Sequence, residues 1–296
     1  ALQAATELEA RILQGQNRTE ESLALLQEQF GATGANTDLK VRSTGLLVQA
    51  QIRDGKTDAA RATLDAALAE TPDSPDLRML SATLYAASQE LDQAEAIYRD
   101  LIEEFPQSEF PVRMLINLLG GTDRDDAAQE VLNQALENQP DQPNLLWIQA
   151  GYLEQSGDTD GAIAIYEKLY EANSASPVVA NNLASLITTH RDDPESLARA
   201  ANIVRRLRGT KVPAFQDTYG WIAYRRDNFE EALEYLEPAA KAMTEEVLVQ
   251  YHLGMTYAAL GRNANAKAQL EKTLEMAGDS PLPEFDRARE TLAGLE

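Results

Sequence analysis

The sequence predicts an all-α protein, a right-handed α-α superhelix (solenoid) of about eight helical hairpins with a C-terminal capping helix. Three observations predict this fold class. Prolines recur at a fixed interval, since Pro72, Pro106 and Pro140 lie 34 residues apart. Alanines recur at the same interval. Aromatic residues make up only 6% of the chain, while alanine and leucine, which favour packed helices, are abundant.

One alanine marks the second helix of almost every predicted unit. The spacing is 34 residues except for one gap of 36, and the series reads Ala60, Ala94, Ala128, Ala162, Ala198, Ala232 and Ala266. A side chain this small lets two helices approach closely, and a larger one would push them apart. The single longer gap predicts a lengthened turn in the sixth unit, from His190 to Pro194.

Each predicted unit has two runs of helical periodicity joined by a short polar turn, such as Arg53 to Asp58. Prolines at the unit ends stop one helix and start the next. A single solenoid is therefore predicted over residues 1–280, and residues 281–296 are predicted to form the capping helix. The predicted units are 3–36, 41–74, 75–108, 109–142, 143–176, 177–212, 213–246 and 247–280.

These recurring residues resemble the repeat pattern of the tetratricopeptide repeat family, which combines Trp, Leu-Gly, Tyr, Ala, an aromatic residue and Pro. The best matches are Tyr219-Gly220 followed by Ala232, Leu236 and Ala239, and Leu253-Gly254 followed by Tyr257, Ala266 and Leu270. The resemblance covers nearly the whole chain. It implies a non-catalytic scaffold that binds a protein or peptide partner.

A narrower resemblance is to bacterial envelope proteins of the same class, associated with exopolysaccharide export and protein sorting. It is carried by the stretches from Asn181 to Ala184 and from Asp217 to Tyr224. It implies an envelope-assembly component in which the array is one part of a larger chain, and it favours the periplasm or envelope over the cytoplasm. A start at Ala1 in mid-pattern fits either a processed form or part of a longer protein.

The charge balance restricts the partners. With 26 basic and 48 acidic residues, the chain has a formal net charge of −22, which repels phosphate backbones and anionic lipid surfaces. Nucleic acid is therefore not an expected partner. Direct membrane insertion is not expected either, because no apolar run approaches the roughly 18 residues needed to span a bilayer. The lack of cysteine excludes a thiolate nucleophile.

The sequence offers no catalytic constellation. The two histidines, His190 and His252, have neither metal-site nor triad spacing, and His252 is expected to be a packed or groove-lining ring. The stretch from Ser156 to Glu167 matches most of a calcium-loop spacing, but a serine replaces its first acid and its second part falls in a predicted helix, so a plain turn is favoured. No metal site, cofactor or enzymatic activity is predicted.

Stacked hairpins turn their first helices inward, so the exposed positions of those helices line a concave groove, the expected binding surface. Large amphipathic side chains are the usual anchors of recognition, which singles out Trp147 and Trp221. Packing between helices is an equal alternative for Trp147. The predicted groove residues are Met79, Arg113, Asn117, Trp147, Asn181, Asn182, Asp217, Trp221, Tyr251 and Met255, and the register adds Glu7, Arg11, Gly45, Gln49, Thr83, Gly151 and Ser185.

Basic residues are concentrated in one segment. Residues 191–226 hold eight basic and four acidic residues, whereas the remainder holds 18 and 44. This basic island is predicted either to dock an acidic segment or to be a solvated face. Its residues include Arg199, Arg205, Arg206, Arg208, Lys211, Arg225 and Arg226. Self-association through the end units is a further possibility, because no unit in this sequence precedes the helix from Leu2 to Leu13.

Overall fold

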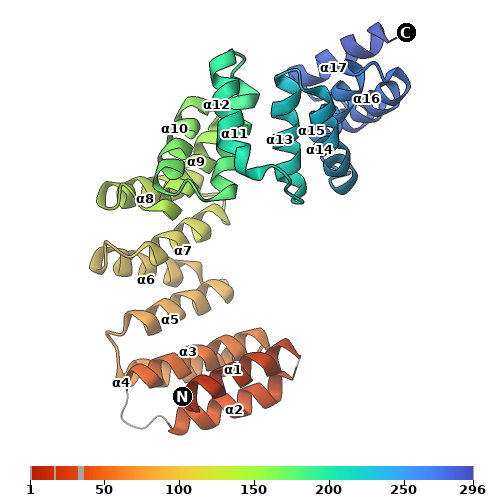
Figure 1. Cartoon of the computed structure of the whole chain (residues 1–296). Coiled ribbons are helices and arrows are strands. Elements are labelled where there is room, and N and C mark those ends of the chain that lie inside the picture. The colour runs from red at the N-terminus through yellow and green to blue at the C-terminus, as the bar shows by residue number, and fades with distance from the viewer. Residues whose placement is uncertain (1, 17, 33–36, 296) are drawn as a thin grey trace. The chain divides into compact units, whose positions relative to one another are not determined.

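The computed structural model of the chain describes residues 2–16, 18–32 and 37–295 (Figure 1). All regular structure in these ranges is helical, and the all-α helical repeat fold predicted from the 34-residue period is confirmed. The chain divides into two compact parts, an N-terminal half (Ala1–Leu145) and a C-terminal half (Leu146–Glu296). Each half is described by itself.

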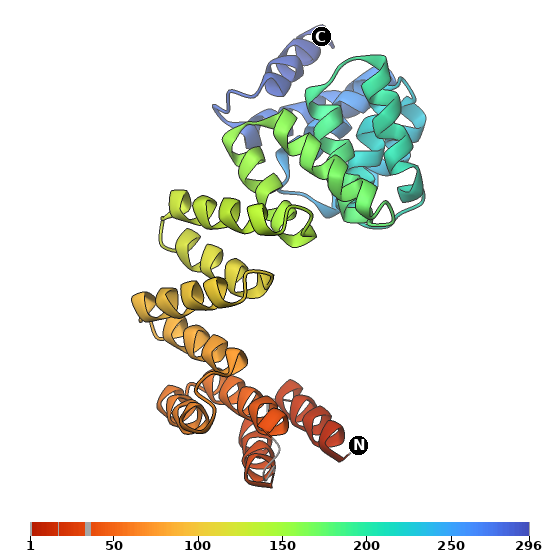
Figure 2. The ribbon, with the colours of Figure 1, turned by 90° about the vertical axis from the view of Figure 1, so that its left-hand side faces the viewer.

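The N-terminal half is a row of helical hairpins in which each helix packs on the next (Figures 1 and 2). Helix pairs α1·α2, α3·α4, α5·α6 and α7·α8 form the hairpins, and α3 also contacts α5. The helices are α1 (Leu2–Gly15), α2 (Thr19–Ala32), α3 (Thr37–Arg53), α4 (Thr57–Glu70), α5 (Pro75–Ala87), α6 (Leu91–Glu104), α7 (Glu109–Gly120) and α8 (Asp125–Asn138).

The C-terminal half contains most of α9 and all later helices. Its hairpins include α11·α12, α13·α14 and α15·α16, and α17 packs on both α15 and α16 as the predicted cap. The helices are α9 (Pro143–Ser156), α10 (Thr159–Ala172), α11 (Pro177–His190), α12 (Pro194–Val204), the 3₁₀ turn η1 (Arg205–Leu207), α13 (Pro213–Arg225), α14 (Phe229–Ala242), α15 (Val247–Ala259), α16 (Asn263–Ala277) and α17 (Pro283–Gly294).

Local sequence signals explain where the helices begin and turn. Prolines occupy the first helical positions of α5, α11, α12, α13 and α17, where a missing N–H costs nothing. Hairpin turns place one residue in the left-handed region, and glycine supplies it at Gly55, Gly157 and Gly261. Asp158 caps α10 by accepting a hydrogen bond from the Gly161 N–H at 3.0 Å. The calcium-like stretch from Ser156 to Glu167 is thus a capped turn followed by helix.

The small residues predicted to recur every 34 residues lie inside the hairpins, between the two helices. The alanines among them are fully buried in six units, at Ala60, Ala94, Ala128, Ala162, Ala232 and Ala266. Ser22 holds the same place in the first hairpin. Its hydroxyl donates to the Ala10 carbonyl at 3.0 Å, which satisfies the buried polar group.

The sixth unit departs from the predicted register. Ala198 is exposed, and the buried small residue is Ala200, followed by the buried Val204 and Leu207. The prediction of a lengthened turn is wrong, because α11 and α12 are joined by residues 191–193, a turn as long as the one between α13 and α14. The buried small residue of α12 lies two residues beyond the predicted position. The prediction that Ala198 is buried between the two helices is wrong. A shift of two residues along a helix moves a side chain to another face of the helix.

No helix in the described ranges is both long and apolar enough to cross a bilayer.

Candidate functional site

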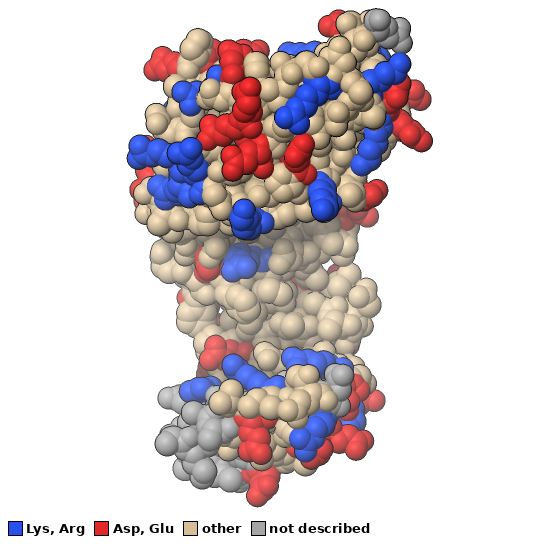
Figure 3. Space-filling view, turned by 45° about the vertical axis from the view of Figure 1, so that its right-hand side comes forward, with Lys and Arg blue, Asp and Glu red and all other residues tan. Residues whose placement is uncertain are grey.

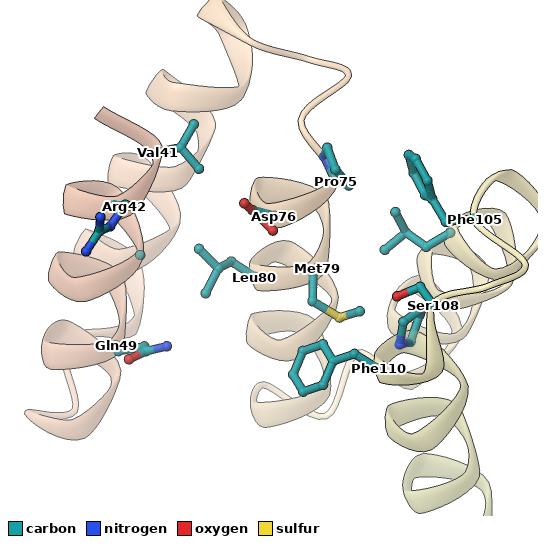
Figure 4. A pocket seen from close by; sticks show the side chains of 13 residues that line it. Val41, Arg42, Gln49, Pro75, Asp76, Met79, Leu80, Phe105, Ser108 and Phe110 are labelled. Atoms are coloured by element: carbon teal, nitrogen blue, oxygen red, sulfur yellow. The ribbon is translucent and has the colours of Figure 1, made fainter. Parts of the chain in front are cut away.

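An open pocket of about 500 Å³ crosses three first helices of the N-terminal half (Figure 4). Side chains from α3, from α5 and from the start of α7 converge on it. Its lining residues are Val41, Arg42, Gly45, Gln49, Pro75, Asp76, Met79, Leu80, Leu101, Phe105, Ser108, Phe110 and Pro111. Three of the predicted inner-face residues, Gly45, Gln49 and Met79, thus lie around one cavity.

Small and large side chains together shape this inner-face pocket. Gly45 leaves space on α3, because an added Cβ would already meet Leu80 Cδ1 at 3.4 Å. Met79 and Phe110 point toward one another across the pocket in Figure 4. Phe110 is 52% exposed and Phe105 is 36% exposed. The pocket therefore presents large apolar side chains to solvent, with Arg42 and Asp76 as its charged groups.

Two further predicted groove residues of the same half lie outside this pocket. Arg113 and Asn117 are one turn apart on α7, and the Asn117 side chain is exposed. Arg113 approaches Glu109 Oε1 at 3.7 Å, and the same oxygen accepts a hydrogen bond from Asn144 Nδ2 at 2.7 Å. Arg113 therefore keeps much of its donor capacity, because its side chain is 42% exposed.

Trp147, Asn181 and Asn182 are brought together in the C-terminal half by Tyr166. The Trp147 ring meets the Tyr166 ring edge-on with centroids 5.5 Å apart. Tyr166 donates its hydroxyl proton to Glu154 at 2.8 Å and accepts from Asn182 Nδ2 at 3.2 Å, while Asn181 Nδ2 donates to Asn182 Oδ1 at 3.4 Å. Burial raises the pKa of Tyr166 to about 12, so the hydroxyl keeps its proton at neutral pH. Trp147 is both packed and 37% exposed.

Trp221 lies in a stack of rings and not on an open surface. It stacks on Tyr224 with centroids 4.6 Å apart and on His252 at 4.0 Å, and only 8% of it is exposed. His252 Nδ1 lies 2.8 Å from Asp217 Oδ1, which holds the imidazole in place. The prediction that Trp221 is an exposed anchor is wrong. Its position on α13 faces α15, where a large ring fills the space between successive first helices.

Tyr251 is also buried, at 1% exposure, in a cluster with Trp221, Leu270 and Ala288, and Met255 packs against this cluster. Ala288 belongs to α17, so the capping helix covers the face on which Tyr251 was predicted to be exposed. That prediction is wrong for this physical reason. Burial raises the pKa of Tyr251 to about 12.

The side chains of the basic island differ in how closely neighbouring residues hold them. Arg225 is only 15% exposed, donates to the Thr188 carbonyl at 2.6 Å and pairs with Asp192, so it holds the turn between α11 and α12 and does not form part of an open basic surface. Arg199 pairs with Glu167 at 2.5 Å, and Arg206 lies over the Tyr170 ring at 5.6 Å. The remaining members, Arg205, Arg208, Lys211 and Arg226, are exposed.

The described residues show no metal or nucleophilic centre. No group of three or more acidic or histidine side chains in the described part of the chain is placed to hold a metal ion. The Asp217–His252 pair has no serine or threonine hydroxyl hydrogen-bonded to its ring among those residues. The surfaces above offer apolar contact, hydrogen bonds and charge, which are the means of binding a partner.

Comparison with protein-family models identifies the family of the chain. Models described as tetratricopeptide repeat match residues 13–84, 51–119, 114–177 and 248–280, well over half of the chain. The chain belongs to the tetratricopeptide repeat family. Its repeat fold is that of a protein–protein interaction scaffold. A comparison with curated proteins finds no match.

Solved structures of other tetratricopeptide repeat proteins share the fold. The APC/C hetero-tetramer Cut9–Hcn1 matches with a TM-score of 0.53 and 13% identity over 97% of this chain and 54% of that chain. PilW, a widely conserved type IV pilus biogenesis factor, matches with a TM-score of 0.50 and 16% identity over 73% and 98% of the two chains. YrrB, a protein with an unusual peptide-binding site, matches at 0.49 and 17% over 65% and 97%. At these identities the likeness shows the fold alone.

Sequence reasoning missed two residues and one contact in this tetratricopeptide repeat protein. Phe105 and Phe110 lie at the boundary between repeats, outside the inner-face register that was searched. Their signal is two aromatic residues flanking a unit boundary in a chain with few aromatics. The contact between Asp217 and His252 was also missed, although their separation of 35 residues, one repeat plus one residue, places them on successive first helices.

Proposed function

We propose that the protein is a non-catalytic scaffold that binds a peptide or protein partner, and that the inner-face pocket between α3, α5 and α7 is a docking point for that partner. The observation that carries the proposal is the pocket of about 500 Å³ with Met79 and Phe110 facing each other across it. Exposed apolar side chains beside a cavity are typical of surfaces that become covered by a partner.

The energetics favour an apolar side chain in the pocket. Covering apolar surface contributes roughly 25 cal/mol per Å², and the half-exposed ring of Phe110 offers surface that the isolated protein leaves in water. Arg42 and Asp76 carry opposite charges on different helices, which supports orientation of a bound chain. The partner expected here is a protein segment with one or two large apolar side chains.

Binding to an enriched peptide tests this proposal. Peptides selected from a random library against the wild-type protein are titrated against Phe110→Ala, and the affinity is expected to fall about tenfold or more because a central aromatic contact is lost. Val178→Ala is the matched control, since Val178 is an apolar side chain that is 45% exposed on another helix. Unchanged affinity of Phe110→Ala, with a normal helical circular dichroism spectrum, would contradict the proposed docking point.

The remaining predicted inner-face residues are proposed as further contacts, each within its own half of the chain. The exposed part of Trp147 and the side chains of Arg113 and Asn117 are accessible to a partner. The other proposed contacts are the partly buried Asn181, Asn182, Asp217 and Met255. Trp221 and Tyr251 are left out because their rings are covered.

A second candidate function is a component of a bacterial envelope assembly, with this array as part of a larger chain. The narrower sequence resemblance carried by Asn181 to Ala184 supports it, and PilW, whose fold is similar, is a pilus biogenesis factor. Fractionation of cells that produce the full natural protein tests this candidate. Recovery solely with the cytosol would count against it.

A further inference from the structure

A small pocket of about 220 Å³ lies on the C-terminal half between α12, α13 and the start of α14. Its inner wall is formed by the buried apolar residues Val204, Ile222 and Ala223. Arginines stand at its edge, with Arg205 from η1 and Arg226 from the turn after α13. This arginine-edged pocket is separate from the inner-face pocket of the N-terminal half.

The charges around the arginine-edged pocket are only partly balanced. Glu231 is the acidic residue of its lining, and its Oε1 accepts from the Tyr219 hydroxyl at 3.0 Å and lies 3.6 Å from Arg208. No side chain in the described ranges pairs with Arg205 or Arg226, and both are exposed. The lining therefore holds two guanidinium groups and one carboxylate, and that carboxylate also lies near Arg208, which leaves an excess of positive charge at the pocket.

This excess is unusual for the chain, whose formal net charge is −22. Acidic and basic side chains lie side by side on the face drawn in Figure 3, where neighbouring charges can balance. Arg205 and Arg226 share one acidic residue, Glu231, within the lining of the pocket. A planar guanidinium binds a carboxylate through two parallel hydrogen bonds, so two unpaired arginines beside one cavity match a short acidic segment.

The surroundings also limit the partner. A nucleic acid presents a long series of phosphates, and the strongly negative chain would repel those that extend past the pocket. A short acidic segment places its charge only at the arginines. We propose that the arginine-edged pocket binds an acidic segment of a partner protein, with Asp or Glu carboxylates on Arg205 and Arg226.

A labelled peptide tests the proposal. The probe is a peptide of about eight residues that is rich in Asp and Glu. The reference peptide has Asn and Gln at the same positions. Fluorescence anisotropy is measured at about 50 mM salt, where charge pairing is only weakly screened. Binding of the acidic peptide alone is expected. The double variant Arg205→Ala/Arg226→Ala is expected to weaken this binding about tenfold or more, since two charge-assisted contacts are lost.

The control variant removes the same charge elsewhere. Arg18→Ala/Arg289→Ala deletes two arginines that are about half exposed and pair with acidic residues three positions away in the sequence, Glu21 and Asp286. This control should bind the acidic peptide within about twofold of wild type. An equal loss in both double variants would overturn the proposal, because it would assign the binding to net charge alone.

Other outcomes also overturn it. Tighter binding of a single-stranded oligonucleotide of equal charge would assign the pocket to phosphate. Sedimentation that shows self-association of the wild type, lost in Arg205→Ala/Arg226→Ala, would make a second copy the occupant. Phe110→Ala should leave acidic-peptide binding unchanged, so this proposal and the proposed function of the inner-face pocket can fail independently.

Discussion

Individual aromatic residues in this chain divide into those that pack and those that remain exposed, and their neighbours decide which. Trp221 is sandwiched by the rings of Tyr224 and His252, whereas Trp147 meets one ring and keeps a free edge. Tyr251 is covered by Ala288 of α17. A hydroxyl buried in this way must stay neutral, because the phenolate would lose its hydration.

This burial predicts an alkaline loss of stability that depends on Tyr251. Its pKa is raised from 10.0 to about 12, so the folded protein keeps the proton over a pH range in which the unfolded chain releases it. The stabilisation is complete below pH 10 and is lost as the pH rises from 10 toward 12. From pH 10 to 12 the free energy of unfolding should therefore fall by about 2 kcal/mol less in Tyr251→Phe than in the wild type. Each unit of pKa shift corresponds to roughly 1.4 kcal/mol. Urea unfolding at both ends of the range measures this, and equal losses in the two proteins would contradict it.

The sequence could identify which residues lie on first helices but not which of them reach solvent. Met79, Gly45 and Gln49, which were predicted on the inner face, line one cavity in the structure. Trp221 and Tyr251 were misplaced because their exposure depends on the helix that follows, including the cap. The spacing of residues along one helix carries no information about the size of the side chains on the adjacent helices that cover it.

At the scale of elements, the closeness of two helices is set by one small residue. Gly220 on α13 has no room for a side chain, since an added Cβ would lie 2.7 Å from Leu236 Cγ and 3.1 Å from the Ala232 carbonyl oxygen. Gly254 meets Leu270 in the same way at 2.6 Å. The repeat pattern predicted these contacts, because the same columns recur in every hairpin.

Two glycine substitutions are therefore expected to have opposite effects. Gly220→Ala should destabilise the protein by about 1–3 kcal/mol, because Leu236 and the backbone of α14 must move. Gly151→Ala should stabilise it by about 0.5–1 kcal/mol, since Gly151 lies within α9 with nothing within 4 Å of its added Cβ and alanine favours the helix. Midpoints of urea unfolding measure both changes, and destabilisation by Gly151→Ala would refute the reasoning.

The sixth unit shows where element-level prediction stops. A lengthened turn was predicted from one gap of 36 residues, but the turn between α11 and α12 is as long as the one between α13 and α14. The gap could not show how the extra residues are shared between turn and helix. In the structure the extra residues lie within α12, because the buried Ala200 is the seventh residue of its helix, whereas the buried Ala232 is the fourth residue of α14.

At the scale of the whole molecule, a repeat array gains stability mainly from contacts between neighbours. Inner helices such as α5 pack on helices before and after them in the chain. Helix α1 packs on α2, while Leu8 and Ile12 on its outer face are 59% and 50% exposed. No described residue covers that face, so α1 has fewer contacts to hold it closed.

Backbone amides of α1 are therefore expected to exchange with solvent deuterium at least about tenfold faster than those of α5 in this chain, because local opening of α1 breaks fewer neighbour contacts. Hydrogen exchange followed by mass spectrometry at low protein concentration measures the two helices in one sample. Equal protection would mean that the outer face of α1 is covered. If protection of α1 then falls on dilution, the cover is a second copy, and Ile12→Lys should abolish it because a buried charge is costly.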